Sequence, residues 1–216
     1  PENFEQLDSA EQIEAMLSLK GTQATADLSA LKLNDPLETD TIQSLATISE
    51  IQALNGEAGC HRYIIRNCRG AIDIVRVMTL LNLLTPEGAA IRVDIVPLFE
   101  TIDDLAEAGS AMAGLYQHAA YRQYLSSRNN KQTVMLGFSD GTKDGGYLMA
   151  NWAIFRAKED LTEVSRAAGI EVAFFDGRGG PPARGGGSTY DFYAALGKRI
   201  ESNQIQLTVQ GQTISS

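Results

Sequence analysis

The feature that most constrains the fold of this chain is the alternation of strand-like and helix-like segments between residues 62 and 209. Short apolar runs rich in β-branched residues predict strands, and longer runs with apolar residues three and four positions apart predict helices. Strands that alternate with helices pair in parallel, because each helix crosses over from one strand to the next. The sequence therefore predicts an α/β fold. Both an open doubly wound sheet and a partial (β/α) barrel fit this order.

Five strands and five helices are expected in this region. The strands are expected at residues 62–66, 91–99, 133–138, 170–175 and 204–209, and the helices at 71–84, 101–115, 118–126, 143–168 and 189–196. An apolar stripe along the longest helix steps by three and four residues, which predicts that one of its faces is buried. The stripe comprises Tyr147, Ala150, Ile154, Ala157, Leu161, Val164 and Ala168. Trp152 and Phe155 lie beside it and are expected to pack as well.

The net charge of the chain is concentrated in its first quarter. The whole chain has 18 Lys+Arg and 27 Asp+Glu, a net charge of −9. Residues 1–59 alone hold 11 acids and 2 bases, which gives 2 − 11 = −9. This segment also carries two helical patterns, one that begins at Ser9 and one over residues 38–54. We therefore expect an acidic helical segment at 1–59 and the partial barrel at 60–216, and an acidic surface argues against nucleic acid as a partner.

The cysteine content and the hydropathy pattern constrain the surroundings of the protein. Cys60 and Cys68 are too few for a disulfide scaffold and match no zinc spacing, so free thiols in a reducing cytoplasm are expected. No apolar run approaches the ~20 residues that a membrane-spanning helix needs, so no membrane partner is expected. The chain begins at Pro1 without a secretory signal and stops just after a strand, which is typical of a piece of a longer protein.

Charged residues follow three successive expected strands. They are Glu100 after the second strand, Asp140 and Lys143 after the third, and Asp176, Arg178 and Arg184 after the fourth. Functional groups gather at the carboxyl ends of parallel strands in both candidate architectures, so these residues are expected to share one edge of the sheet. A carboxylate at such a position can also be a helix N-cap, and this alternative applies to Glu100 and Asp140.

The residue types at this edge suit a metal ion and an anion. Two carboxylates from neighbouring strands are typical ligands of Mg²⁺ or Mn²⁺, which keep several waters for substrate oxygens. Two guanidinium groups and an ammonium group suit a phosphate or a carboxylate. The loop at 177–187 has six glycines, including Gly179 and Gly180, whose backbone N–H groups can approach an anion closely. A flexible linker is the alternative interpretation of this loop.

Other polar residues are weaker candidates for the site. Arg62, Arg66 and Arg69 lie near the first expected strand, where pairing with acids of the first quarter is favoured over binding an anion. His61 and His118 are far apart in the pattern, and Ser139 has no evident His and Asp partners for a catalytic triad.

Four segments together resemble the phosphoenolpyruvate carboxylase family. Residues 134–146 are similar to the signature V-M-x-G-[YF]-S-D-S-x-K-D-x-G, and residues 175–187 are similar to the loop F-H-G-R-G-G-x-x-G-R-G-G-G. Residues 96–101 match the family's metal-carboxylate strand, and residues 207–212 resemble its segment R-V-T-x-Q-G-E. The motifs stand in the family's order over residues 91–216, whereas the first 90 residues resemble the family only diffusely.

The resemblance implies a fold, an activity and a set of site residues. The family is mostly helical, is built around an eight-stranded barrel and is usually a homotetramer. It is a cytoplasmic lyase that joins bicarbonate to phosphoenolpyruvate with Mg²⁺ or Mn²⁺ and releases oxaloacetate and phosphate. This is a carbon-dioxide-fixing step that feeds the tricarboxylic acid cycle. The resemblance makes Glu100 and Asp140 the metal ligands and assigns substrate binding and catalysis to Lys143, Arg178 and Arg184, with Gly179 and Gly180 also contacting substrate.

The chain differs from the family pattern at a position where proton transfer is expected. The family's loop histidine is replaced by Asp176, which puts an acid where a proton-carrying imidazole is expected. A catalytic histidine from the family's N-terminal third also has no counterpart here, so the isolated chain is expected to be inactive. Two other functions stay open at this point. One is a metal-dependent phosphoenolpyruvate or pyruvate barrel enzyme of another class, and the other is a non-catalytic anion-binding module.

Overall fold

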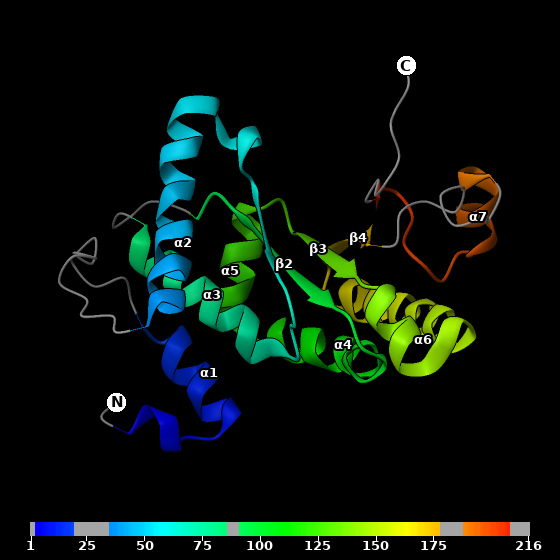
Figure 1. The fold of residues 1–216 in the computed structure, drawn as a ribbon, viewed down its shortest axis with the longest axis horizontal. Helices are drawn as coiled ribbons and strands as arrows, with labels where there is room; N and C mark the ends of the chain where they lie inside the picture. The colour runs from blue at the N-terminus through cyan, green and yellow to red at the C-terminus, as the bar shows by residue number, and fades with distance from the viewer. Residues whose placement is uncertain (1–2, 20–34, 86–90, 178–187, 208–216) are drawn as a thin grey trace.

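Five parallel strands form a single sheet in the computed structural model, which describes residues 3–19, 35–85, 91–177 and 188–207. The strands are β1 (Arg62–Ile65), β2 (Asp94–Phe99), β3 (Lys131–Leu136), β4 (Glu171–Asp176) and β5 (Ile205–Leu207), and their order in the sheet is their order in the chain (Figure 1). The predicted α/β fold with parallel strands is therefore confirmed. A doubly wound sheet reverses its strand order, and the described strands contain no reversal. The described sheet is open, with β1 and β5 at its edges.

The helices lie close to the predicted positions. They are α1 (Ser9–Leu17), α2 (Pro36–Asn55), α3 (Ala71–Leu84), α4 (Ile102–Leu115), α5 (Ala119–Ser127), α6 (Ser139–Ala167) and α7 (Thr189–Ala195), with short 3₁₀ turns at Phe4–Gln6 and Glu57–Gly59. In Figure 1, α4 and α6 run side by side beneath the sheet, and α2 and α7 lie at opposite sides of the molecule. None of the helices in the described part of the chain is long and apolar enough to cross a bilayer.

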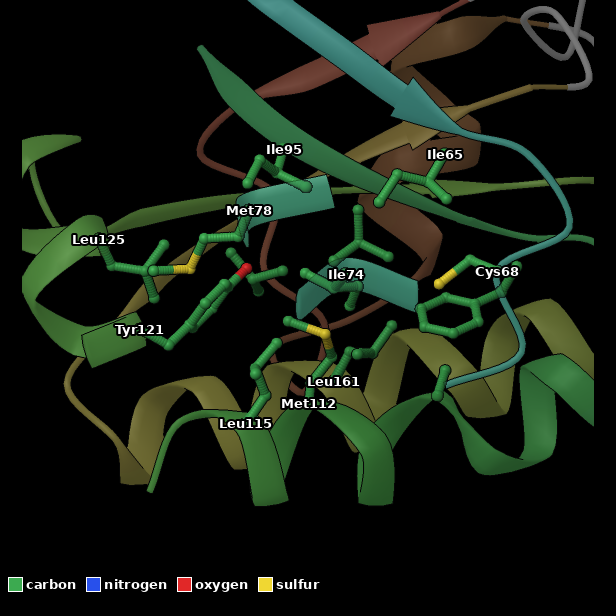
Figure 2. Close-up of a cluster of buried hydrophobic side chains, with 14 of the residues drawn as sticks. Ile65, Cys68, Ile74, Met78, Ile95, Met112, Leu115, Tyr121, Leu125 and Leu161 are labelled. Atoms are coloured by element: carbon green, nitrogen blue, oxygen red, sulfur yellow. The ribbon is translucent and has the colours of Figure 1, made fainter. Parts of the chain in front are cut away.

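The hydrophobic core lies between one face of the sheet and the helices. Successive side chains of a strand point to opposite faces, and Val134, Leu136, Val172 and Phe174 all belong to this core cluster. Figure 2 shows Ile65 and Ile95 of the sheet directed toward Met112, Leu115 and Leu161 of the helices, with Ile74 and Met78 between them. Val96, Leu98 and Ala173 are buried outside that cluster, on the opposite face of the sheet. The sheet thus has one face that is covered by helices and a second face whose buried residues lie outside the core cluster.

The long helix α6 is broken near its start. Gly146 has φ 80° and ψ 171°, so Ser139–Gly145 forms a short helical segment of its own before the main helix. Glycine adopts this positive φ without the steric cost of a side chain. The prediction that Tyr147 is buried is wrong, because Tyr147 begins the main helix directly after the break and is 61% exposed. The predicted packing of Trp152 in the core is wrong as well, because Trp152 is 57% exposed and stacks on Phe155 at the surface.

The two free cysteines differ in their surroundings, and we expect them to differ in reactivity. Cys68 is fully buried, and burial raises the pKa of its thiol to about 12, whereas Cys60 is half-buried. Since the thiolate is the reactive form, iodoacetamide at pH 8 is expected to label Cys60 and leave Cys68 unmodified. Peptide mapping by mass spectrometry of the folded protein measures both sites. Equal labelling in native buffer would contradict this packing, and equal labelling in denaturant is the control.

Candidate functional site

The ends of β2, β3 and β4 meet in one row at the carboxyl edge of the sheet. Leu136 pairs with Phe99 on one side and with Asp176 on the other. The next rung continues with the backbone N–H of Gly137 donating to Phe99 O at 2.8 Å and that of Gly177 donating to Leu136 O at 2.9 Å. Glu100 therefore stands beside Gly137. The predicted gathering of these strand ends at one edge is confirmed.

The absence of a side chain at Gly137 leaves room for Glu100. A Cβ at this position would lie 3.1 Å from Glu100 Cα and 3.2 Å from Glu100 Cγ, which is tighter than ordinary van der Waals contact. The carboxylate of Glu100 therefore lies over Gly137, on the side of the sheet opposite the core cluster. Glu100 is only 8% exposed. A buried carboxylate at a strand end needs polar partners.

Those partners come from the turn after β1. The backbone N–H of Asn67 donates to Glu100 Oε2 at 3.0 Å, and Nε of the exposed Arg66 lies 3.9 Å from Oε1. Asn67 has φ 53°, a left-handed conformation that asparagine tolerates better than most residues. The predicted pairing of Arg66 with an acid of the first quarter is not found among the described residues, where Arg66 lies near Glu100 instead. The Nε of Arg62 is buried and has no hydrogen-bond partner within the described ranges.

Asp140 and Lys143 lie on the short first segment of α6. Lys143 Nζ donates to Asp140 Oδ1 at 2.9 Å, and both side chains are accessible to solvent. The segment contacts β2 through Gly141, where a Cβ would lie 3.4 Å from Glu100 O. The chain that carries Asp140 and Lys143 thus passes directly against the backbone of Glu100.

Neither carboxylate is a helix N-cap. Helix α4 is capped by Thr101, whose hydroxyl accepts from the N–H of Asp104 in a capping box, so Glu100 lies outside that helix. Asp140 is the second residue of α6, and Phe138 holds its N-cap position without a side-chain hydrogen bond. The alternative interpretation of Glu100 and Asp140 as capping residues is therefore wrong. Their placement calls for another explanation.

The donor set at this edge fits a hard divalent cation that keeps most of its water. Oxygen ligands from one or two carboxylates are what Mg²⁺ takes from proteins when substrate oxygens complete its shell. Within the described residues, no group of three or more His, Cys, Asp or Glu side chains is arranged to hold a metal. The assignment of Glu100 and Asp140 as metal ligands therefore stays a prediction from the sequence.

Asp176 does not join this set. It follows Phe174 by two residues and pairs with Leu136, so its side chain lies on the helix-covered face of the sheet. There it forms a buried ion pair with Lys158 of α6, a residue that sequence reasoning missed. A lysine between Ile154 and Leu161 of a buried stripe is the signal that could have found it.

Part of the expected site lies beyond the described structure. Arg178, Arg184, Gly179 and Gly180 fall outside the described residues, and so does most of the glycine-rich loop. Their convergence with Glu100, Asp140 and Lys143 stays a prediction from the sequence.

Comparison with known proteins identifies the family. The family model described as phosphoenolpyruvate carboxylase matches residues 1–216, which is the whole chain. The chain belongs to the phosphoenolpyruvate carboxylase family. The resemblance noted on residues 91–216 is confirmed, and it extends through the first 90 residues.

Individual relatives agree with this assignment. The phosphoenolpyruvate carboxylases of Corynebacterium diphtheriae and Nitrosomonas eutropha are each 38% identical over 99% of this chain, which covers 24% and 23% of their lengths. That of Nocardia farcinica is 42% identical over 74% of this chain and 18% of its own length. The chain thus spans about a quarter of the length of the first two relatives. Neither an enzyme of another barrel class nor a non-catalytic anion-binding module is favoured by these matches.

Proposed function

We propose that this chain is part of the catalytic domain of a phosphoenolpyruvate carboxylase, which uses bicarbonate and releases oxaloacetate and phosphate. The observation that supports this most is the juxtaposition of Glu100 with the Asp140–Lys143 segment at one sheet edge, in a chain that matches the family throughout. The activity belongs to the full-length protein. The 216 residues alone have no turnover.

The architecture supports a partial barrel. Five parallel strands in sequential order, with α3, α4 and α6 in one core cluster with the sheet, form the arrangement of successive units of a (β/α) barrel. The remaining strands come from parts of the full-length protein beyond these residues. The barrel is part of a cytoplasmic homotetramer.

Glu100 and Asp140 would hold Mg²⁺ or Mn²⁺. A cation bound there supplies positive charge to substrate oxygens as negative charge develops on them. Glu100 is fixed for this by the N–H of Asn67, which orients one carboxylate oxygen and leaves the other facing Arg66 at 3.9 Å. Asp140, in the first turn of α6, is accessible from solvent.

Lys143 serves the anionic substrate. Its ammonium group lies 2.9 Å from Asp140 in an exposed ion pair, which contributes little stability and breaks at small cost. The side chain can therefore move from Asp140 to a phosphate oxygen when substrate arrives. Arg178 and Arg184 bind the phosphate and carboxylate groups as bidentate forks, and Gly179 and Gly180 add backbone N–H groups.

Glu100→Gln in the full-length protein tests the site. The substitution keeps the size of the side chain and removes its charge, so kcat/KM is expected to fall by about 100-fold or more. Incorporation of labelled bicarbonate into oxaloacetate measures the activity, and titration with Mn²⁺ followed by electron paramagnetic resonance measures the metal.

The matched control is Glu163→Gln, an exposed acid on α6. It is expected to leave both readouts unchanged. Retention of Mn²⁺ binding and of activity in Glu100→Gln would remove Glu100 from the site. Absence of bicarbonate incorporation in the parent full-length protein would overturn the proposed function itself.

A further inference from the structure

A buried charged cluster joins three elements near the carboxyl end of β4. Lys158 Nζ of α6 lies 2.8 Å from Asp176 Oδ1 and 2.9 Å from Oδ2, so it contacts both carboxylate oxygens. Tyr193 of α7 donates its hydroxyl to Asp176 Oδ2. The side chains of Lys158 and Asp176 are only 3% and 5% exposed. We call these three residues the Lys158 cluster.

Aromatic rings enclose the ammonium group. Nζ of Lys158 lies 5.4 Å from the ring centroid of Phe174 and 5.4 Å from that of Tyr193, both within the range of a cation–π contact. The charge of Lys158 is thus balanced by one carboxylate and shielded from water by two rings. Removing either partner of such a buried pair leaves the other charge without compensation.

The orientation of Asp176 separates it from the proposed site. Its side chain shares the helix-covered face with Phe174 and Leu136, whereas Glu100 lies over Gly137 on the other face. A general acid or base must come within hydrogen-bond reach of the proton it moves, directly or through one water. A carboxylate bound by both oxygens inside the helix layer does not meet this condition.

The cluster also joins two parts of the chain across the glycine-rich loop. Asp176 precedes residues 177–187 and Tyr193 follows them. Beyond α7, the chain is fixed to α6 again, because the N–H of Glu201 donates to Thr162 Oγ1 at 3.0 Å and Arg166 pairs with Glu201 at 3.1 Å. The cluster is therefore one contact that attaches α7 to the end of β4.

We propose that Lys158 and Tyr193 are positioning residues that hold Asp176 as a permanently engaged carboxylate, which anchors β4 and α7 and exchanges no proton with substrate. This inference rests on the proposed function. It assigns the acid that replaces the family histidine to an anchoring role on the far side of the sheet. Arg178, which the resemblance assigns to substrate binding, is two residues away in sequence.

Asp176→Asn in the full-length protein distinguishes the anchor from a catalytic acid or base. Asparagine has nearly the same shape and still accepts from Tyr193, so kcat is expected to stay within about 10-fold of the parent value, with both limbs of the pH–rate profile retained. A loss of about 100-fold or more together with the loss of one limb would show that Asp176 moves a proton and would overturn the proposal.

Tyr193→Phe tests the positioning role. The variant keeps the ring over Lys158 and removes one hydrogen bond to Asp176, so KM for phosphoenolpyruvate is expected to rise about 3- to 10-fold while kcat changes less than about 2-fold. Phe192→Leu, next to it on α7, is the control for ring packing alone. A fall in kcat at constant KM, or no change in either constant, would contradict positioning.

Thermal unfolding of the same protein tests the pair without reference to turnover. Lys158→Met/Asp176→Leu removes both charges, and it is expected to unfold at a higher temperature than Lys158→Met or Asp176→Leu alone, because neither partner is left buried and unpaired. Additive losses in the double variant would overturn the pairing. The proposed function is tested separately, by whether the parent full-length protein incorporates labelled bicarbonate into oxaloacetate.

Discussion

Lys158→Met is expected to destabilise the protein by about 3–5 kcal/mol, the cost of leaving a buried carboxylate without its cation. Asp176 is only 3% exposed at the end of β4 and is covered by α6 and α7, so little water can replace the lost ammonium group. Methionine fills a similar volume, which keeps the loss of packing small. Equilibrium unfolding of the full-length protein in urea, followed by circular dichroism, measures the change.

The control for this variant is Lys198→Met. Lys198 is exposed, and its side chain forms no ion pair within the described ranges. Its substitution is expected to change the free energy of unfolding by less than about 0.5 kcal/mol. A loss below about 1 kcal/mol for Lys158→Met would mean that Asp176 finds another compensating partner and that the ion pair matters little for stability.

Gly137→Ala is expected to lower kcat/KM by about 10- to 100-fold, because the new methyl group moves Glu100. The added Cβ would lie 3.1 Å from Glu100 Cα and 3.3 Å from Phe99 O, and both atoms belong to the backbone of β2 and its end. Backbone cannot rotate away as a side-chain tip can, so the strand end itself must shift. The free energy of unfolding is expected to fall by about 1–3 kcal/mol.

Gly114→Ala is the matched control. A Cβ at Gly114 meets nothing within 4 Å, and the residue lies in α4, where alanine is the better helix former. Activity is expected to stay unchanged and stability to rise slightly. Steady-state kinetics and urea unfolding of both variants check the pair. A Gly137→Ala protein with full activity would show that the position of Glu100 is not critical.

The sequence predicted the elements well where burial and strand pairing coincide. The helix at 71–84 was predicted with the bounds that α3 has. The strand predicted from residue 91 begins only at Asp94, because Ile91 and Val93 are buried but precede the pairing of β2 with β1. Conversely, β3 begins at Lys131, before the predicted residue 133, since a polar pair of residues joins the ladder there. Apolar patterns report burial, whereas strand bounds depend on a partner strand.

The same distinction applies to the site. Glu100, Asp140 and Lys143 could be found because each follows a strand directly, and the parallel fold brings strand ends together. Lys158 could not be assigned a role, because its partner lies 18 residues away in the chain and the contact depends on how α6 packs against β4. The hydrogen bond from Asn67 to Glu100, across 33 residues, depends on tertiary structure in the same way.

The break at Gly146 has a consequence for how such a protein can diverge. The main part of α6 packs against α4 and the sheet, and the short segment before the break carries Asp140 and Lys143. In a continuous helix, every rotation about the helix axis would also rotate Asp140 and Lys143. A shift of the helix by one residue would rotate both by about 100°. Because the helix is broken at Gly146, core substitutions can rotate the main part of α6 without reorienting the side chains of Asp140 and Lys143.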